Sequence, residues 1–219
     1  MIRFFYFYRF NLMTLKRIFL LVVTLLSSMT SFAQFAFNPQ IGLSVAKLRN
    51  LESEESTKAR VGWHAGADFR IGRRFYVQPG IYYWQTSTAF INDSLRIQTD
   101  LQRSDIKLNA RLGLNLLDDE NAKIRFSIGP SYNVLISKSA KSDDLDKVTL
   151  GELEDNFNNG VFNFDAGLGV DFWKISFDLG YSIGLSDALD NTAYYKSEAR
   201  YGTFYFNVGL VIGNATSSK

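Results

Sequence analysis

The 219-residue sequence contains no cysteine, three prolines and one histidine. The absence of cysteine excludes a disulfide framework, thiolate metal sites and the lipid-modified N-terminal cysteine of bacterial lipoproteins. The chain also lacks a P-loop, a G-x-G-x-x-G motif and any metal-ligand spacing. We therefore predict no catalytic residue, no cofactor-binding residue and no metal ligand, and no cofactor.

The sequence also lacks a hydrophobic run long enough for a spanning helix. The apolar segment Ile18–Leu26 is about ten residues long, whereas a helix needs roughly 20 to cross a membrane. It follows Lys16-Arg17 and precedes the small-residue site Ser31-Phe32-Ala33. This order is typical of a secretory signal peptide, so we predict cleavage after residue 33. The alternative is a membrane anchor, and Met13 offers a second possible start.

The first 33 residues hold four basic residues and no acidic one. Of the 24 basic residues of the whole chain, this leaves 20 against 22 acidic residues in the mature part. A mature chain with a slightly negative balance gives no electrostatic reason to expect a nucleic-acid partner. The predicted organisation is a signal peptide (1–33) followed by one β-domain (34–219).

What the chain does have is alternation with a period of two. From Val61 to Tyr83, apolar residues alternate with small or polar ones, interrupted by a short turn at Gly72–Arg74. Ten residues of this pattern on each side of a tight turn predict a β-hairpin of membrane-crossing length. The same pattern predicts six further strands, over Phe37–Val45, Asp105–Leu116, Ile124–Val134, Phe162–Phe172, Ile175–Gly184 and Thr203–Ile212.

The connections between these strands alternate between long and short. Leu117–Lys123 and Trp173-Lys174 are short turns, whereas Thr86–Arg103, Ser137–Asn159 and Ser186–Arg200 are predicted as polar, irregular stretches. Up-and-down outer-membrane barrels have this arrangement, with tight periplasmic turns and long external loops. We therefore predict an all-β, eight-stranded antiparallel transmembrane barrel in the outer membrane of a Gram-negative cell, with both termini in the periplasm.

The polar face of the strands distinguishes this barrel from a water-soluble one such as a lipocalin. A surface in water normally carries many Lys and Glu residues, but here that face is mostly Gly, Ser, Asn and Asp. Small polar residues suit the crowded interior of eight strands, so the apolar face should meet lipid. The aromatic residues expected at the two membrane interfaces are Phe35, Phe37, Phe75, Tyr132, Phe172, Trp173 and Phe204.

Charged residues on the polar face are predicted to pair with one another and fill the interior. His64 lies on the same face as Asp68, roughly 13 Å away along the strand, so the two form no local catalytic dyad. A proton or ion pathway is the alternative, and acidic loop segments (Asp143-Asp144, Asp146 and Glu54-Glu55) could hold Ca²⁺ loosely. The residues expected to pair are Asp68, Arg70, Lys107, Arg111, Asp165, Asp171 and Asp178.

The chain resembles the PorT-like outer-membrane β-barrel family of Bacteroidetes-type bacteria. The resemblance is carried by Gly62 and Gly66, Gln78-Pro79, Gly129-Pro130, the Gly167/Gly169 strand and Tyr181–Leu185. It implies an eight-stranded barrel, and one namesake of the family is tied to type IX protein secretion. Departures are Gly80, the missing proline in Leu101–Ile106 and the polar tail Gly213–Lys219.

These observations lead to one functional hypothesis and three alternatives. We expect a non-enzymatic, monomeric barrel with a side-chain-filled interior that contacts outer-membrane lipid. Its role is either structural, in supporting the membrane, or one of contacting other envelope proteins through its external loops. The alternatives are an accessory component of a secretion system, a membrane-embedded hydrolase using His64, and a narrow pore.

Overall fold

The computed structural model describes residues 35–49, 55–92, 97–119, 122–141, 158–188 and 200–213. Contacts divide the chain into the units Met1–Ala33 and Gln34–Lys219, and every described residue belongs to the second unit. The signal peptide and its cleavage site lie outside the described residues and stay predictions. Over the described ranges, no helix has the length and hydropathy to span a membrane.

Eight antiparallel strands close into a barrel, as predicted. Each strand pairs with the next in sequence, and β1 closes the ring by pairing with both β2 and β8. A short ninth segment continues β8 and pairs with the start of β1. The strands are β1 (Phe35–Arg49), β2 (Glu55–Gly72), β3 (Phe75–Asn92), β4 (Ile97–Asp118), β5 (Ala122–Lys141), β6 (Gly160–Phe172), β7 (Ile175–Gly184), β8 (Arg200–Leu210) and β9 (Ile212–Gly213).

Alternate residues point into and out of this barrel, and the polar face is the inner one. In β7, Ser176, Asp178 and Ser182 are buried. Their apolar neighbours Ile175 and Leu179 are exposed on the outside. An outer surface made of such side chains is far larger than the apolar patches that water-soluble proteins tolerate. The predicted assignment of the two faces is therefore confirmed.

The strands β2 to β5 are much longer than the sequence pattern indicated. They contain 18, 18, 22 and 20 residues, whereas β6, β7 and β8 contain 13, 10 and 11. At roughly 3.4 Å per residue, β4 is about 75 Å long and β7 only about 34 Å. The prediction that Thr86–Arg103 is irregular was wrong, because Thr86–Asn92 and Ile97–Arg103 form strand.

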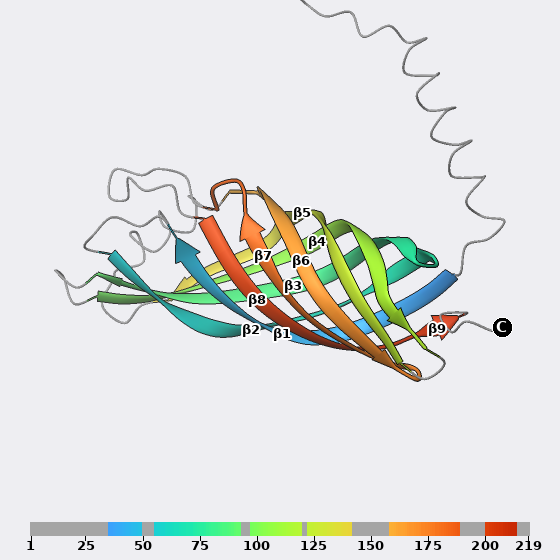
Figure 1. The fold of residues 1–219 in the computed structure, drawn as a ribbon. Coiled ribbons are helices and arrows are strands. Elements are labelled where there is room, and N and C mark those ends of the chain that lie inside the picture. The colour runs from blue at the N-terminus through green and yellow to red at the C-terminus, as the bar shows by residue number, and fades with distance from the viewer. Residues whose placement is uncertain are drawn as a thin grey trace, which may run out of the picture. The chain divides into compact units, whose positions relative to one another are not determined.

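These extra residues form a four-stranded sheet that stands on one side of the barrel. Figure 1 shows β3 and β4 running past the ends of the other strands. Within the described ranges, the extra segments pair with one another, and of their residues only Ser104 also pairs with a residue outside them, Gln85. Bulges at Ala59/Trp63 and Ser104/Asp105 mark where this sheet leaves the barrel. We call it the wall extension, comprising Glu55–Ala59, Thr86–Asn92, Ile97–Ser104 and Ser137–Lys141.

Of the tight turns at the opposite end of the barrel, called here the turn end, two consist wholly of described residues. The β2–β3 turn follows Gly72, whose φ of 134° is accessible to glycine and costly for other residues. The β6–β7 turn holds Trp173 at a φ of 54°, a left-handed conformation that costs a non-glycine residue roughly 1–2 kcal/mol. Trp173 is also 67% exposed, as an interfacial aromatic side chain should be.

Aromatic side chains surround the outside of the barrel at two levels. Near the turn end, Phe69 contacts both Phe35 and Phe37, with ring centroids 5.5 and 5.1 Å apart. Towards the other end, aromatic residues pair across neighbouring strands. These pairs are Trp63 with Tyr83, Tyr132 with Phe162, and Tyr181 with Phe204. All seven aromatic residues predicted for the interfaces thus point outward at one of the two levels.

Candidate functional site

Charged side chains fill the interior, and the two signs nearly balance. A buried carboxylate without a partner would cost several kcal/mol, so pairing is a condition for placing these groups inside. Within the described ranges, the buried acids are Asp68, Asp105, Asp165, Asp171 and Asp178, and the buried bases are Arg70, Arg103, Lys107, Arg111, Lys123 and Arg125. The sixth base, Lys123, pairs with Asp118 at the exposed end of β4, at 2.9 Å.

The layer nearest the turn end is a cluster of two arginines and two aspartates. Arg70 Nη1 lies 2.7 Å from one oxygen of Asp171, and Arg125 Nη2 lies 2.8 Å from the other. Arg125 also contacts Asp178 at 3.0 Å. Ser176 accepts hydrogen bonds from both arginines and donates one to Asp178. The cluster joins β2, β5, β6 and β7 across the interior.

The middle layer is organised around Asp68 of β2. Tyr82 donates a hydrogen bond of 2.7 Å to this carboxylate and Gln40 one of 3.0 Å. Arg111 approaches it at 3.7 Å and donates a hydrogen bond to Tyr205 across the barrel. Tyrosine and arginine side chains are long enough to fill the axis of eight strands, which leaves no open channel at this level.

The next layer contains His64 and Lys107. His64 is fully buried, hydrogen-bonds to Asn207 and stacks on Trp84 with ring centroids 3.8 Å apart. Lys107 Nζ lies 4.5 Å from the centre of the same Trp84 ring and 3.0 Å from Asp165. The single histidine is thus part of the packed interior.

Apolar and hydrogen-bonded residues cover the interior at the end opposite the turns. Arg103 pairs with Asp105 at 2.8 Å and donates a hydrogen bond to the backbone oxygen of Asn158. Asn158 is in turn bonded to Asp187 and Ala188. A small apolar cluster made of Ala46, Val161, Ala188 and Tyr201 lies beside them.

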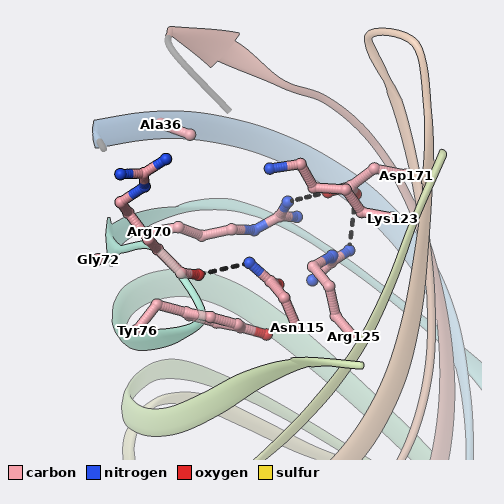
Figure 2. Close-up of a pocket in the computed structure, with 9 residues that line it drawn as sticks. Ala36, Arg70, Gly72, Tyr76, Asn115, Lys123, Arg125 and Asp171 are labelled. Atoms are coloured by element: carbon pink, nitrogen blue, oxygen red, sulfur yellow. Dashed lines mark hydrogen bonds and ion pairs between the residues drawn. The ribbon is translucent and has the colours of Figure 1, made fainter. Parts of the chain in front are cut away.

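Described residues line two small cavities, one near each end of the interior. The turn-end cavity, shown in Figure 2, has a volume of about 20 Å³ and is lined by Arg70, Tyr76 and Arg125 among others. The other cavity has the same volume and is lined by Trp84, Arg103 and others. A space of this size holds about one water molecule. The two cavities share no lining residue, and the Asp68 layer lies between them.

The predicted pairing of charges is confirmed, and the sequence analysis missed some of its members. All seven predicted residues take part in ion pairs of the interior. Arg125 and Asp105 could have been included, because they share the inward parity of their strands. Arg103 was missed because it falls in the stretch predicted to be irregular. The tyrosines Tyr82 and Tyr205 also share the inward parity of their strands, but parity alone did not indicate that they bond to the interior charges.

The described residues contain no arrangement typical of a hydrolase or a metal site. His64 bonds to an amide and lies four residues before Asp68, whose own partners are Tyr82, Gln40 and arginines. Over the described ranges, no group of three His, Cys, Asp or Glu side chains could hold a metal ion. The acidic segments Asp143-Asp144 and Asp146 lie outside these ranges, as does Glu54.

Comparison with known proteins agrees with this architecture. The sequence pattern of the family described as "Outer membrane protein beta-barrel domain" matches residues 30–190. The chain belongs to this outer-membrane β-barrel family. No curated protein matches the sequence. The protein is therefore a membrane protein of the Gram-negative outer membrane, with lipid against its apolar outer face.

Solved outer-membrane barrels share the fold at low sequence identity. OprG from Pseudomonas aeruginosa aligns with a TM-score of 0.53 at 8% identity, covering 82% of this chain and 95% of that one. Ail of Yersinia pestis gives 0.47 at 13% identity over 82% and 99% of the two chains. Neisserial surface protein A gives 0.47 at 13% over 80% and 97%. At these identities the likeness concerns the fold alone.

Membership in the outer-membrane family gives the barrel an orientation. Short turns of such barrels face the periplasm and long connections face the cell exterior. The turn end, with Gly72 and Trp173, is thus periplasmic, and the wall extension stands on the outer surface of the cell.

Proposed function

We propose that this protein is a non-enzymatic, monomeric barrel that binds other envelope components through its wall extension and external loops. The observation that carries the proposal is the length of β2 to β5. An apolar belt of about 25 Å is crossed by roughly 9–11 tilted residues, so 22 residues of β4 exceed what spanning requires. An ordered sheet beyond the lipid is a rigid platform with its backbone already fixed.

The filled interior supports a binding role over transport. Layers of buried ion pairs at Asp171, Asp68 and Asp165 occupy successive levels of the barrel. Moving a solute through them would require several buried charge pairs to separate at once. Each such separation leaves uncompensated charge in a medium of low dielectric.

The surroundings of His64 support a non-enzymatic role. A hydrolase would need this histidine beside a serine and a carboxylate at an accessible rim, whereas it is 0% exposed and bonded to Asn207. Purified wild-type protein and a His64→Ala variant should show the same background turnover of fluorogenic ester and peptide substrates. Turnover that depends on His64 would contradict this part of the proposal.

The wall extension can be shortened without changing the membrane-spanning part. Ser87 lies directly opposite Gln102, so residues 88–101 can be replaced by an Asn-Gly turn. In a matched control, the same turn replaces residues 93–96 and joins Asn92 to Ile97, which are also opposite each other. Both variants should fold in the outer membrane and show the heat-dependent gel mobility of a barrel.

Photo-crosslinking in living cells then tests the proposal. The control should retain the envelope proteins captured by the wild type, and the shortened variant should lose them. Equal capture by both variants, or no capture by the wild type, would contradict a role for the wall extension.

The PorT-like resemblance supports a second candidate, an accessory role in type IX-like secretion. Its residues, such as Gln78-Pro79 and Gly129-Pro130, lie in β3 and β5 within the barrel rather than in the wall extension. They therefore support the family architecture more than any shared partner. Profiling secreted proteins in a deletion strain separates the two candidates: selective loss of secreted cargo favours secretion, and an unchanged profile favours the first proposal.

A further inference from the structure

The turn-end cavity is open to the periplasm and surrounded by positive charge. Its lining includes the guanidinium-bearing residues Arg70, Arg73 and Arg125 and the ammonium group of Lys123, with Asp171 as the one acidic lining residue. Figure 2 shows Arg70 and Arg125 directed toward Asp171 from different sides. The cavity is therefore a candidate site for an anion.

The cationic side chains that line the cavity outnumber their acidic partners by one. Asp171 and Asp178 compensate Arg70 and Arg125, and Asp118 compensates Lys123. Arg73 forms no ion pair with any residue in the described part of the chain, and its side chain is exposed at the mouth. A bound monoanion would neutralise this remaining charge.

Two buried arginines of the lining each have a donor without a hydrogen-bond partner. Arg70 is 6% exposed and Arg125 is 2% exposed, yet the Nε group of each donates no hydrogen bond. The nearest acid to Arg70 Nε is Asp68, at 3.7 Å. A guanidinium group presents a fork of donors that suits the oxygens of a phosphate group.

The place of the cavity in the membrane indicates the source of such a ligand. Phe75 is 74% exposed and Trp173 is 67% exposed, and both flank the periplasmic turns. Exposed aromatic side chains of this kind lie at the level of lipid headgroups. Arg73 is two residues from Phe75, so it lies where the phosphates of the inner leaflet are found.

We propose that the turn-end cavity binds one phosphate group, either free or carried by an inner-leaflet phospholipid. The volume of about 20 Å³ has room for about one oxygen atom of the group, beside Arg70 and Arg125. The rest of the group stays in the open mouth, where Arg73 contacts it. This site is independent of the wall extension and of the function proposed for it.

Two adjacent arginines provide a matched test. Arg73 lines the cavity, whereas its neighbour Arg74 does not, and both side chains are exposed. The wild type, Arg73→Gln and Arg74→Gln are refolded in a non-ionic detergent. Binding of inorganic phosphate is measured by the rise in unfolding temperature and by ³¹P line broadening, against sodium chloride of equal ionic strength.

The wild type and Arg74→Gln should bind phosphate equally, and Arg73→Gln should bind it about tenfold more weakly, as expected for one lost charge-assisted contact. Equal responses of the two variants, or a wild-type response no larger than that to chloride, would overturn the proposal. In nanodiscs, weaker phosphate binding with phosphatidylglycerol than with phosphatidylcholine identifies the lipid as the source, and unchanged binding identifies free phosphate.

Discussion

Arg70 and Asp171 meet at 2.7 Å across the interior, although they belong to strands on opposite sides of the barrel. β2 and β6 are four strands apart in a ring of eight, so this contact spans the diameter. A barrel this narrow lets side chains from facing walls touch, and the ion pair closes the passage that a wider barrel would leave open.

Removing the charge of Asp171 should strongly destabilise the barrel. Asp171→Asn leaves Arg70 and Arg125 with an incomplete set of partners, and breaking a buried pair in this way costs about 3–5 kcal/mol. The control is Asp187→Asn, which breaks the half-exposed pair with Arg200 and should cost at most about 1 kcal/mol. Urea unfolding in lipid vesicles, followed by tryptophan fluorescence, measures both. Equal losses of unfolding free energy in the two variants would contradict the claim that ion pairs inside the barrel stabilise it more than half-exposed ones.

Two inward glycines should respond differently to an added methyl group. A Cβ on Gly113 would collide with the ring of Tyr76, so Gly113→Ala should cost about 1–3 kcal/mol through overpacking. A Cβ on Gly167 would meet its nearest neighbours at 3.4 Å, an ordinary contact. Gly167→Ala should therefore be neutral or stabilise by up to about 1 kcal/mol, because it restricts the unfolded chain. Urea unfolding in lipid vesicles measures both variants. A larger loss of unfolding free energy in Gly167→Ala than in Gly113→Ala would refute the packing described around these two glycines.

The sequence predicted the faces and the periplasmic turns because lipid enforces a strict pattern. Every second residue in a spanning strand must be apolar, and this alternation is visible between Ile175 and Gly184, where the predicted and observed strand agree. The residues of the wall extension lie beyond the lipid, so this requirement does not apply to them. Thr86–Asn92 (TSTAFIN) therefore shows no regular alternation of apolar and polar residues, and its strand is fixed by pairing with β2 and β4 rather than by its own pattern.

The pairing of the interior charges could be predicted only in part. Parity places Asp68, Arg111 and Asp178 inside, and burial then requires each charge to have a partner. Which charged side chains pair with one another depends on the stagger of the strands around the barrel. The alternation within a single strand does not specify this stagger. The contact between Gln40 of β1 and Asp178 of β7 is an example, because these residues are 138 positions apart in sequence.

The purified barrel should be electrically closed. In planar bilayers, insertion of the wild type should give no stepwise conductance, because the Asp68 layer with Tyr82 and Arg111 occupies the axis. Heat-dependent gel mobility of protein recovered from the same preparation verifies folding. Reproducible, ion-selective steps from folded protein would contradict the filled interior and favour the pore.

The most direct test of the account is the unfolding free energy of two lipid-face variants measured in vesicles. Leu112 is 65% exposed near the middle of the spanning part of β4, and Leu116 is 57% exposed close to the periplasmic end. Leu112→Arg should lower the unfolding free energy by about 2–4 kcal/mol and Leu116→Arg by at most about 1 kcal/mol, because the cost of a charge falls toward the interface. Equally small losses at both positions would mean that water, and not lipid, covers the apolar face.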